Sequence, residues 1–202
     1  SVFRDENSHQ LMIAGAGQMQ IDTALKMLSR KYGGMAKLKT PSVPYKETIT
    51  KKIQVQGKLK KQSGGHGQFA NTWIEFEPLP RGGGFEFVDK ITGGIIPKQF
   101  IPSVEKGISD SLNQGILAGF PVVDIKATLY DGSFHDVDSS DFAFQMAGSF
   151  ALKLALEQAG SILLEPIMSV RIAVTEELTG EIIKDVSGRR GKVLGMAMEG
   201  KK

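Results

Sequence analysis

The first candidate for chemistry is a glycine-rich stretch at residues 63–67, which reads Ser-Gly-Gly-His-Gly. Glycine lets backbone N–H groups approach a phosphate closely, because no Cβ stands in the way. Lys58, Lys60 and Lys61 precede the stretch, and together with His66 they would add positive potential. The Gly-Lys-Ser/Thr ending of a nucleotide-binding P-loop is absent. Two interpretations stay open, an anion-binding loop and a simple glycine turn beside solvated lysines.

A second candidate is His135, which has Asp131, Asp136 and Asp138 as neighbours in sequence. Carboxylates raise the basicity of an imidazole and bind hard cations, so a general base and a metal site are the two chemistries to consider. The chain has only 3 histidines, which makes a multi-histidine metal site hard to build. We therefore favour a turn histidine followed by aspartates that cap a helix.

Composition limits the classes of protein to which the chain can belong. With 202 residues, 41% of them hydrophobic, the chain can bury a core, and without cysteine it has neither disulfides nor thiolate metal sites. The net charge of +3 is small but uneven, since five lysines occur between Lys51 and Lys61 without an acid. No apolar run is long enough to span a bilayer, so we expect a cytoplasmic protein with no membrane partner.

Hydrophobic periodicity indicates the elements that hold these segments. Alternating apolar and polar residues predict strands at residues 48–59 and 72–78, which form a hairpin around the glycine-rich loop. Further expected elements are strands at residues 85–90 and 122–130 and helices at residues 102–117 and 139–159. The longer of these helices begins where Asp138 or Ser139 can act as its N-cap. The aromatic residues expected in the core are Trp73, Phe76, Phe85 and Phe87.

The patterns at both ends of the chain predict incomplete α/β units. A linker at Pro41 and Pro44 separates the N-terminal unit from the central part of the chain. The elements expected there are strands at residues 10–14, 167–174 and 193–198 and helices at residues 18–31 and 178–187. Strands without partners leave apolar edges that favour pairing with another chain. We therefore expect these ends to pack on each other or on a neighbouring molecule.

Several longer motifs resemble translation elongation factor G, in the order in which its domains follow one another. Those of its fourth domain are GGHGQF at residues 64–69, GGIIPKQFIPSVEKGI at 93–108, GSFHDVDSSDFAF at 132–144 and LLEPIM at 163–168. Residues 13–22 (IAGAGQMQID) resemble its third domain, and residues 188–193 (GRRGKV) resemble its fifth. At His66 and Phe69 the sequence departs from the common form and is similar to a second, paralogous type.

The resemblance implies an α+β fold in three parts. Residues 44–162 would form domain IV, which is similar to domain 2 of ribosomal protein S5 and contains a β-α-β unit. Residues 1–43 and 163–202 would be partial ferredoxin-like β-α-β units from domains III and V. The parent protein would be a translational GTPase that binds GTP and Mg²⁺ in a separate domain, so this chain by itself would be neither an enzyme nor a cofactor carrier.

The resemblance also implies a function in translation. Its partners would be the ribosomal RNA and the tRNA–mRNA of the decoding-centre A site. Two tip loops, residues 63–69 and 132–136, would enter this site during translocation. His135 would contact RNA by stacking or hydrogen bonding. The residues expected to contact the ribosome are Lys58, Lys60, Lys61, Ser63, Gly64, Gly65, His66, Gly67, Gln68, Ser133, Phe134, His135, Asp136, Arg189 and Arg190.

Two alternatives to translocation stay open. The substitutions at His66 and Phe69 favour a paralogue that acts in ribosome recycling or protection. A small-molecule kinase could share a β-α-β architecture and a glycine-rich loop, although no pattern of catalytic lysine, aspartate and Mg²⁺ ligands accompanies this one. For Arg189 and Arg190, a solvated helix end is the alternative to RNA contact.

Overall fold

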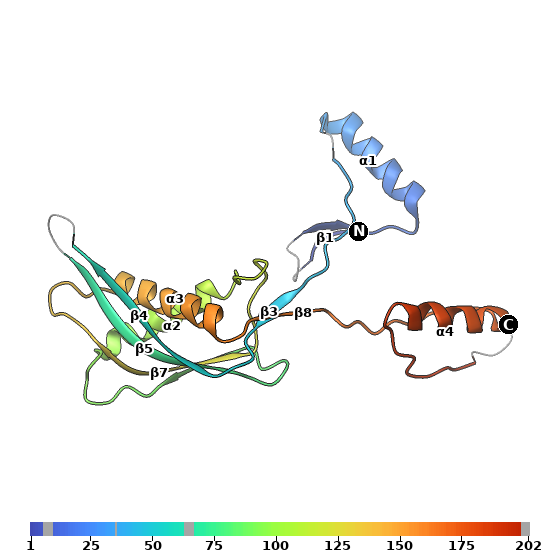
Figure 1. The fold of residues 1–202 in the computed structure, drawn as a ribbon. Coiled ribbons are helices and arrows are strands. Elements are labelled where there is room, and N and C mark those ends of the chain that lie inside the picture. The colour runs from blue at the N-terminus through green and yellow to red at the C-terminus, as the bar shows by residue number, and fades with distance from the viewer. Residues whose placement is uncertain (6–9, 35, 63–66, 199–202) are drawn as a thin grey trace. The chain divides into compact units, whose positions relative to one another are not determined.

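The computed structural model describes residues 1–5, 10–34, 36–62 and 67–198 (Figure 1). The chain divides into two compact units, residues 1–166 and residues 167–202. The division at residues 43 and 162 that the sequence suggests stays a prediction. Among the described residues, no helix is both long enough and apolar enough to cross a membrane.

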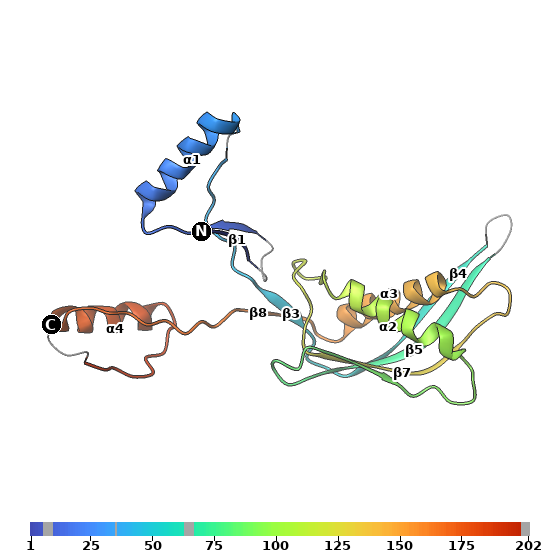
Figure 2. The same cartoon turned by 180° about the vertical axis from the view of Figure 1, so that it is seen from behind.

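A four-stranded sheet with two helices on one face forms the centre of the first unit, as Figures 1 and 2 show from opposite sides. Its strand order is β4-β5-β7-β6, and only the β6–β7 pair is parallel. The elements are β4 (Ile53–Lys61), β5 (Gln68–Pro78), β6 (Phe85–Asp89), η1 (Lys98–Phe100), α2 (Ile101–Ser111), β7 (Ile125–Ser133) and α3 (Asp141–Gln158). Because α2 connects the parallel strands β6 and β7, the expected β-α-β unit is present and the α+β class is confirmed.

The core lies between the sheet and the two helices. Alternate side chains of β5, including Ile74 and Phe76, are fully buried there. Phe100 stacks on Phe144 of α3 with 4.8 Å between the ring centroids. Phe85 and Phe87 also pack against this cluster, as the sequence predicts. Burial of apolar surface on this one face of the sheet is the main force that holds the unit together.

Trp73 is the exception among the predicted core aromatics. Successive side chains of a strand point to opposite faces, so Phe76 on the helix side places Trp73 on the other side of the sheet. There it lies half-buried, opposite Gln56 of β4 and Asp131 of β7. The prediction that Trp73 is a core residue was wrong because it counted aromatic residues without following the two-residue period.

The two helices approach each other closely through small residues. A Cβ at Gly107 of α2 would overlap the backbone of Gln145 in α3, and a Cβ at Gly148 of α3 would lie 2.6 Å from the carbonyl oxygen of Val104. Each helix thus presents a glycine to the backbone of the other. This contact holds α3, and with it the loop that precedes α3, against the rest of the unit.

Helix α2 ends at Ser111, six residues before the predicted end at residue 117. The following segment turns around Glu47 of β3 (Lys46–Thr48), whose side chain is fully buried. The Glu47 carboxylate accepts hydrogen bonds from the backbone N–H groups of residues 117, 118 and 120, at 3.0, 2.9 and 3.2 Å. A buried carboxylate requires such donors, and a continuing helix could not supply them. The longer helix was predicted because apolar residues recur every four positions from Val104 to Ile116. That repeat carries no information about Glu47.

Strand β3 also joins the segment that precedes the central sheet to the segment that follows α3. It pairs antiparallel with β8 (Ile162–Leu164), and the backbone N–H groups of Thr50 and Lys51 donate to the carbonyl of Ala159 at 3.2 and 3.0 Å. Glu47 therefore ties the loop after α2 to the β3–β8 pair, where the chain enters and leaves the central sheet and its two helices.

At the N-terminal end, β1 (Val2–Arg4) and β2 (Leu11–Ile13) form an antiparallel hairpin, and α1 (Gln18–Tyr32) follows. The predicted strand and helix are confirmed, and Gly33 ends the helix in the left-handed region at φ 66°. The strand at Val2–Arg4 was not predicted. Strands β1 and β2 pair with each other. The predicted packing of this end on the other end or on a neighbouring molecule stays a prediction.

The second unit contains η2 (Glu176–Leu178) and α4 (Thr179–Gly188), which confirms the helix expected at residues 178–187. The strands expected at residues 167–174 and 193–198 are not formed. A strand exists only where a second strand accepts its hydrogen bonds. None of residues 167–198 takes part in such a ladder, although their apolar composition alone suggests strands.

The buried carboxylate gives a prediction about stability. Glu47→Ala would leave three backbone N–H groups without their acceptor, and each such group costs about 1–3 kcal/mol. Allowing for partial hydration of the loop, we expect the free energy of unfolding to fall by about 2–4 kcal/mol. The single tryptophan, Trp73 in the sheet, can report the urea-induced transition by its fluorescence. Glu47→Gln, which keeps one acceptor oxygen, should lose less.

Glu105→Ala on the exposed side of α2 is the matched control, and it should change the free energy of unfolding by less than about 0.5 kcal/mol. Equal unfolding midpoints for Glu47→Ala and Glu105→Ala would contradict the role assigned to the Glu47 carboxylate.

Candidate nucleic-acid interface

Two connections meet at one end of the central sheet, and we call this end the tip: residues 62–67 between β4 and β5, and residues 134–140 between β7 and α3. The pairing of Lys61 with Gln68 closes the hairpin, and the pairing of Asn71 with Ser133 brings the end of β7 beside the start of β5. The structure thus gathers the described residues Lys60, Lys61, Gly67, Gln68, Ser133, Phe134, His135 and Asp136 at the tip. The predicted contacts Ser63, Gly64, Gly65 and His66 lie outside the described residues.

Gly132 and Ser133 differ from the prediction, which placed them in the second tip loop. Both belong to β7, because the strand continues past a register shift between Trp73 and Ile74 of β5. Gly132 packs against Ile96, where a Cβ would lie 2.5 Å from a side-chain carbon. The Ser133 hydroxyl accepts a hydrogen bond from the Asn71 amide at 3.2 Å. Ser133 therefore supports the tip from within the sheet.

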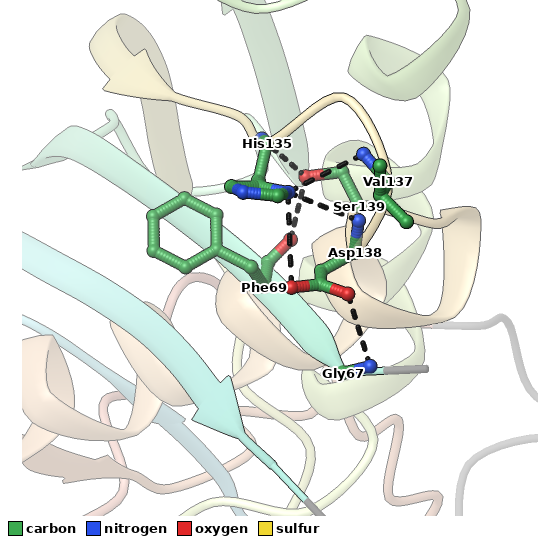
Figure 3. A network of polar contacts seen from close by, with 6 residues as sticks. All are labelled: Gly67, Phe69, His135, Val137, Asp138 and Ser139. Carbon is green, nitrogen blue, oxygen red and sulfur yellow. Dashed lines mark hydrogen bonds and ion pairs between the residues drawn. The ribbon is translucent and has the colours of Figure 1, made fainter. Parts of the chain in front are cut away.

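Asp138 and Ser139 fasten the two connections to each other (Figure 3). The Asp138 carboxylate accepts a hydrogen bond from the Gly67 N–H at 3.0 Å, and its backbone carbonyl accepts one from the Phe69 N–H at 2.7 Å. The Ser139 hydroxyl donates to the carbonyl of Phe69 at 2.7 Å and accepts from the His135 N–H at 2.9 Å. The bonds to Gly67 and Phe69 hold the second connection against the start of β5, and the bond from His135 shapes the second connection itself.

These two residues were expected to cap α3, and that expectation was wrong. The cap is Ser140, whose hydroxyl accepts from the Ala143 N–H at 3.1 Å. Gln68 then accepts a hydrogen bond from the same Ser140 hydroxyl at 2.6 Å. Sequence reasoning missed the fastening role because it treated Asp138 and Ser139 as alternatives for one capping position.

The imidazole of His135 lies at the surface of the tip, with 57% of its side chain exposed. Its Nδ1 accepts hydrogen bonds from the N–H groups of Val137 and Asp138, each at 3.3 Å. In the neutral ring this places the proton on Nε2. The ring of Phe69 meets it edge-on, with 6.4 Å between the centroids. His135 is therefore oriented by its own loop and presents an N–H donor outward.

A hollow of about 250 Å³ lies between the two connections. Its walls are Lys60, Lys61, Gln62, Gln68, Phe69, His135 and Asp138. Lysine, amide and aromatic groups of this kind bind a phosphate and the base or sugar beside it, whereas the Asp138 carboxylate opposes a phosphate. The volume is below the roughly 300–1,000 Å³ of pockets that enclose small molecules, so the hollow suits part of a larger ligand.

The lysines of the hairpin differ in their ion-pair partners between its base and its tip. Lys52 lies 2.7 Å from Glu75 and 3.4 Å from Glu77, and its hydrogen bond to Glu75 lowers the pKa of that carboxyl group. In contrast, no described carboxylate lies within 4.0 Å of Lys58, Lys60 or Lys61. The strand residues opposite these lysines are the neutral Asn71, Phe69 and Gln68. Positive potential is thus greatest where the hairpin reaches the tip.

The remaining candidates do not join this cluster. Arg189 pairs with Asp185 at 2.9 Å at the end of α4, and Arg190 follows with φ 64°. Both belong to the unit of residues 167–202. Of the residues that the structure describes, no three histidine, aspartate or glutamate side chains form a group that could hold a metal ion. The Asp138 carboxylate beside His135 is used instead in a hydrogen bond within the tip.

Comparisons with known proteins agree along the whole chain. The model of "Elongation factor G, domain IV" matches residues 41–160, and that of "Elongation factor G C-terminus" matches residues 162–202. Elongation factor G of Aquifex pyrophilus is 50% identical over 196 residues, which are 97% of this chain and 28% of that protein. A crystal structure from Thermus thermophilus is similar with a TM-score of 0.84 and 40% identity, over 99% of this chain and 30% of that one. The chain thus spans less than a third of these relatives.

The fastening of the tip gives a prediction that separates hydrogen bonding from charge. Asp138→Ala removes the acceptor of the Gly67 N–H, so we expect amide exchange at Gly67 to accelerate at least about ten-fold, as about 1.4 kcal/mol of lost protection implies. Asp138→Asn keeps an acceptor oxygen and should preserve most of the protection. Hydrogen exchange followed by NMR measures both.

The amide of Phe69 is the internal control, because its acceptor is the backbone carbonyl of Asp138, which both substitutions retain. Unchanged exchange of Gly67 in Asp138→Ala would show that the Asp138 side chain does not fasten the first connection.

Proposed function

This chain belongs to the elongation factor G family, and on that premise we propose that its tip is a ribosome-binding surface that contacts RNA. The observation that carries the proposal is the coincidence, at one end of the sheet, of lysines without a carboxylate partner among the described residues and a hollow bounded by aromatic rings and amides. RNA offers phosphates to the lysines and bases or 2′-hydroxyls to the hollow.

Each residue type has a distinct part in the proposal. Lys60 and Lys61 would neutralise phosphates, and such contacts release counterions and make binding sensitive to salt. The outward Nε2–H of His135 would donate to a phosphate, a base or a 2′-hydroxyl. Asp138 and Ser139 would act as positioning residues, since their side chains already hold the two connections together. Holding Gly67, Phe69 and residues 134–140 in place before binding lowers the entropy cost of binding.

We further propose that the tip enters the decoding-centre A site while tRNA and mRNA move through the ribosome. This is the finer function implied by family membership, and it assigns GTP and Mg²⁺ to a GTPase domain of the parent protein. The residues of this chain would supply no chemical step. Their contribution is a rigid, positively charged projection whose length is set by β4, β5 and β7.

Salt-dependent co-sedimentation with ribosomes tests the proposal. We expect the chain to bind ribosomes at about 50 mM salt and to lose affinity as salt rises. A variant with Lys60, Lys61 and His135 changed to Ala should bind at least about ten-fold more weakly at low salt. Its salt dependence should be shallower, because each lost phosphate contact removes about 0.7–0.9 from the slope of log K against log [salt].

The matched control is Lys51→Ala combined with Lys106→Ala, which removes two exposed lysines away from the tip. This variant should bind like the wild type. Equal binding by the tip variant and the control, or binding that does not respond to salt, would argue against an RNA-binding tip.

A further inference from the structure

A groove along the side of the central sheet, away from the tip hollow, carries a second proposal. It lies between the edge strand β4 and helix α3 and has a volume of about 470 Å³. Its walls are Gln56 and Lys58 from β4 and Phe150, Lys153, Leu154 and Glu157 from α3. Residues 150, 153, 154 and 157 follow the spacing i, i+3, i+4 and i+7, so they form one stripe along the helix.

This stripe is exposed, and it is distinct from the stripe of α3 that faces the core. All four of its residues are exposed, whereas Ala147, Ala151 and Leu152 are buried. Phe150 and Leu154 leave 36% and 37% of their surface accessible. Single exposed apolar side chains are common on protein surfaces, so the informative feature is that Phe150 shares one groove with two lysines.

The charges and the ring define the ligand. Lys58 and Lys153 stand on opposite walls, and no described carboxylate lies within 4.0 Å of either. Lysines that line one groove can bind an anion, and the exposed phenyl ring of Phe150 in the same groove offers a stacking surface to a flat, uncharged group. A nucleotide of single-stranded RNA combines the two, because its phosphate and its base are close neighbours.

The groove is also continuous with the basic edge of the hairpin. Lys58 and Lys60 leave β4 on the same side, about 6.8 Å apart along the strand, and Lys61 follows. A protein segment that adds to the edge of β4 is the other occupant to consider, but lysines on an edge strand oppose such pairing. Charge and continuity therefore favour an RNA strand.

We propose that the groove between β4 and α3 is a second RNA-binding site, which takes one unpaired nucleotide of a single strand with its phosphate between Lys58 and Lys153 and its base on Phe150. Glu157 at the same groove opposes a phosphate and limits affinity. The proposal shares Lys58 with the expected ribosome contacts, but its test uses Phe150, Lys153 and Glu157, none of which belongs to the tip, so it can hold or fail independently of the proposed function.

A fluorescein-labelled single-stranded RNA of about 12 nucleotides and mixed sequence is the probe, and anisotropy at about 50 mM salt is the measurement. We expect Lys153→Ala to weaken binding about three-fold or more and to reduce the salt slope by about 0.7. Phe150→Leu keeps an apolar side chain but removes the ring, and it should weaken binding about five-fold or more. Glu157→Lys should tighten binding.

Three controls separate the groove from the tip and from folding. Lys106→Ala removes an exposed lysine of α2 outside both sites and should leave the affinity unchanged. Lys60→Ala with Lys61→Ala should weaken binding by a factor that multiplies with the groove substitutions, as independent contacts do. Circular dichroism melting should confirm that Phe150→Leu is folded at the temperature of the assay.

The proposal is overturned if the wild type does not bind the probe, or if Lys153→Ala and Phe150→Leu bind it like Lys106→Ala. Weaker RNA binding by Glu157→Lys would also overturn it. In that case a protein segment would be the better candidate for the groove, with Glu157 as an attractive contact.

Discussion

The antiparallel pairing of β5 with both β4 and β7 is the constraint on which the candidate site depends. The chain leaves β4 at Lys61, returns in β5 at Gln68, and reaches the same end again when β7 ends at Ser133. Gly67 and Asp138 are 71 residues apart in sequence, and their two connections are neighbours because of strand direction alone. Side-chain hydrogen bonds from Asp138 and Ser139 then fix a proximity that the sheet has already imposed.

Different parts of the same sheet contribute to stability and to the proposed binding. One face and the base carry the stability: apolar side chains of β5 pack under α2 and α3, and Lys52 is neutralised by Glu75. Glu47 ties the loop after α2 to β3 through three backbone N–H groups. The lysines of the tip and of the edge of β4 have no ion-pair partner in the part of the chain that the structure describes, so they contribute little to folding and are available to a polyanion. Stability and proposed function therefore place few conflicting demands on the same residues.

Apolar periodicity predicted the hairpin and the long helix, and the family resemblance implied that the two tip segments lie together. Local patterns failed where a residue's role depends on a distant partner. The end of α2 depends on Glu47, which lies far earlier in the chain. Asp138 was taken for a helix cap because its acceptor role involves the distant Gly67, whereas Trp73 was misplaced because the two-residue period of β5 was not followed. The strands expected at residues 167–174 and 193–198 lack the ladder partners that define a strand.

The most direct test of the central claim is hydroxyl-radical probing of ribosomal RNA from a single position on the tip. The sequence contains no cysteine, so Asp136→Cys creates a unique site for an iron chelate beside His135. We expect the tethered chelate to cleave small-subunit RNA around the decoding centre, and a chelate at Lys51→Cys, at the other end of the sheet, to give a different pattern. Cleavage absent from the decoding centre with the position-136 chelate, under conditions where the chain binds ribosomes, would contradict the assignment of the tip as the part that contacts RNA there.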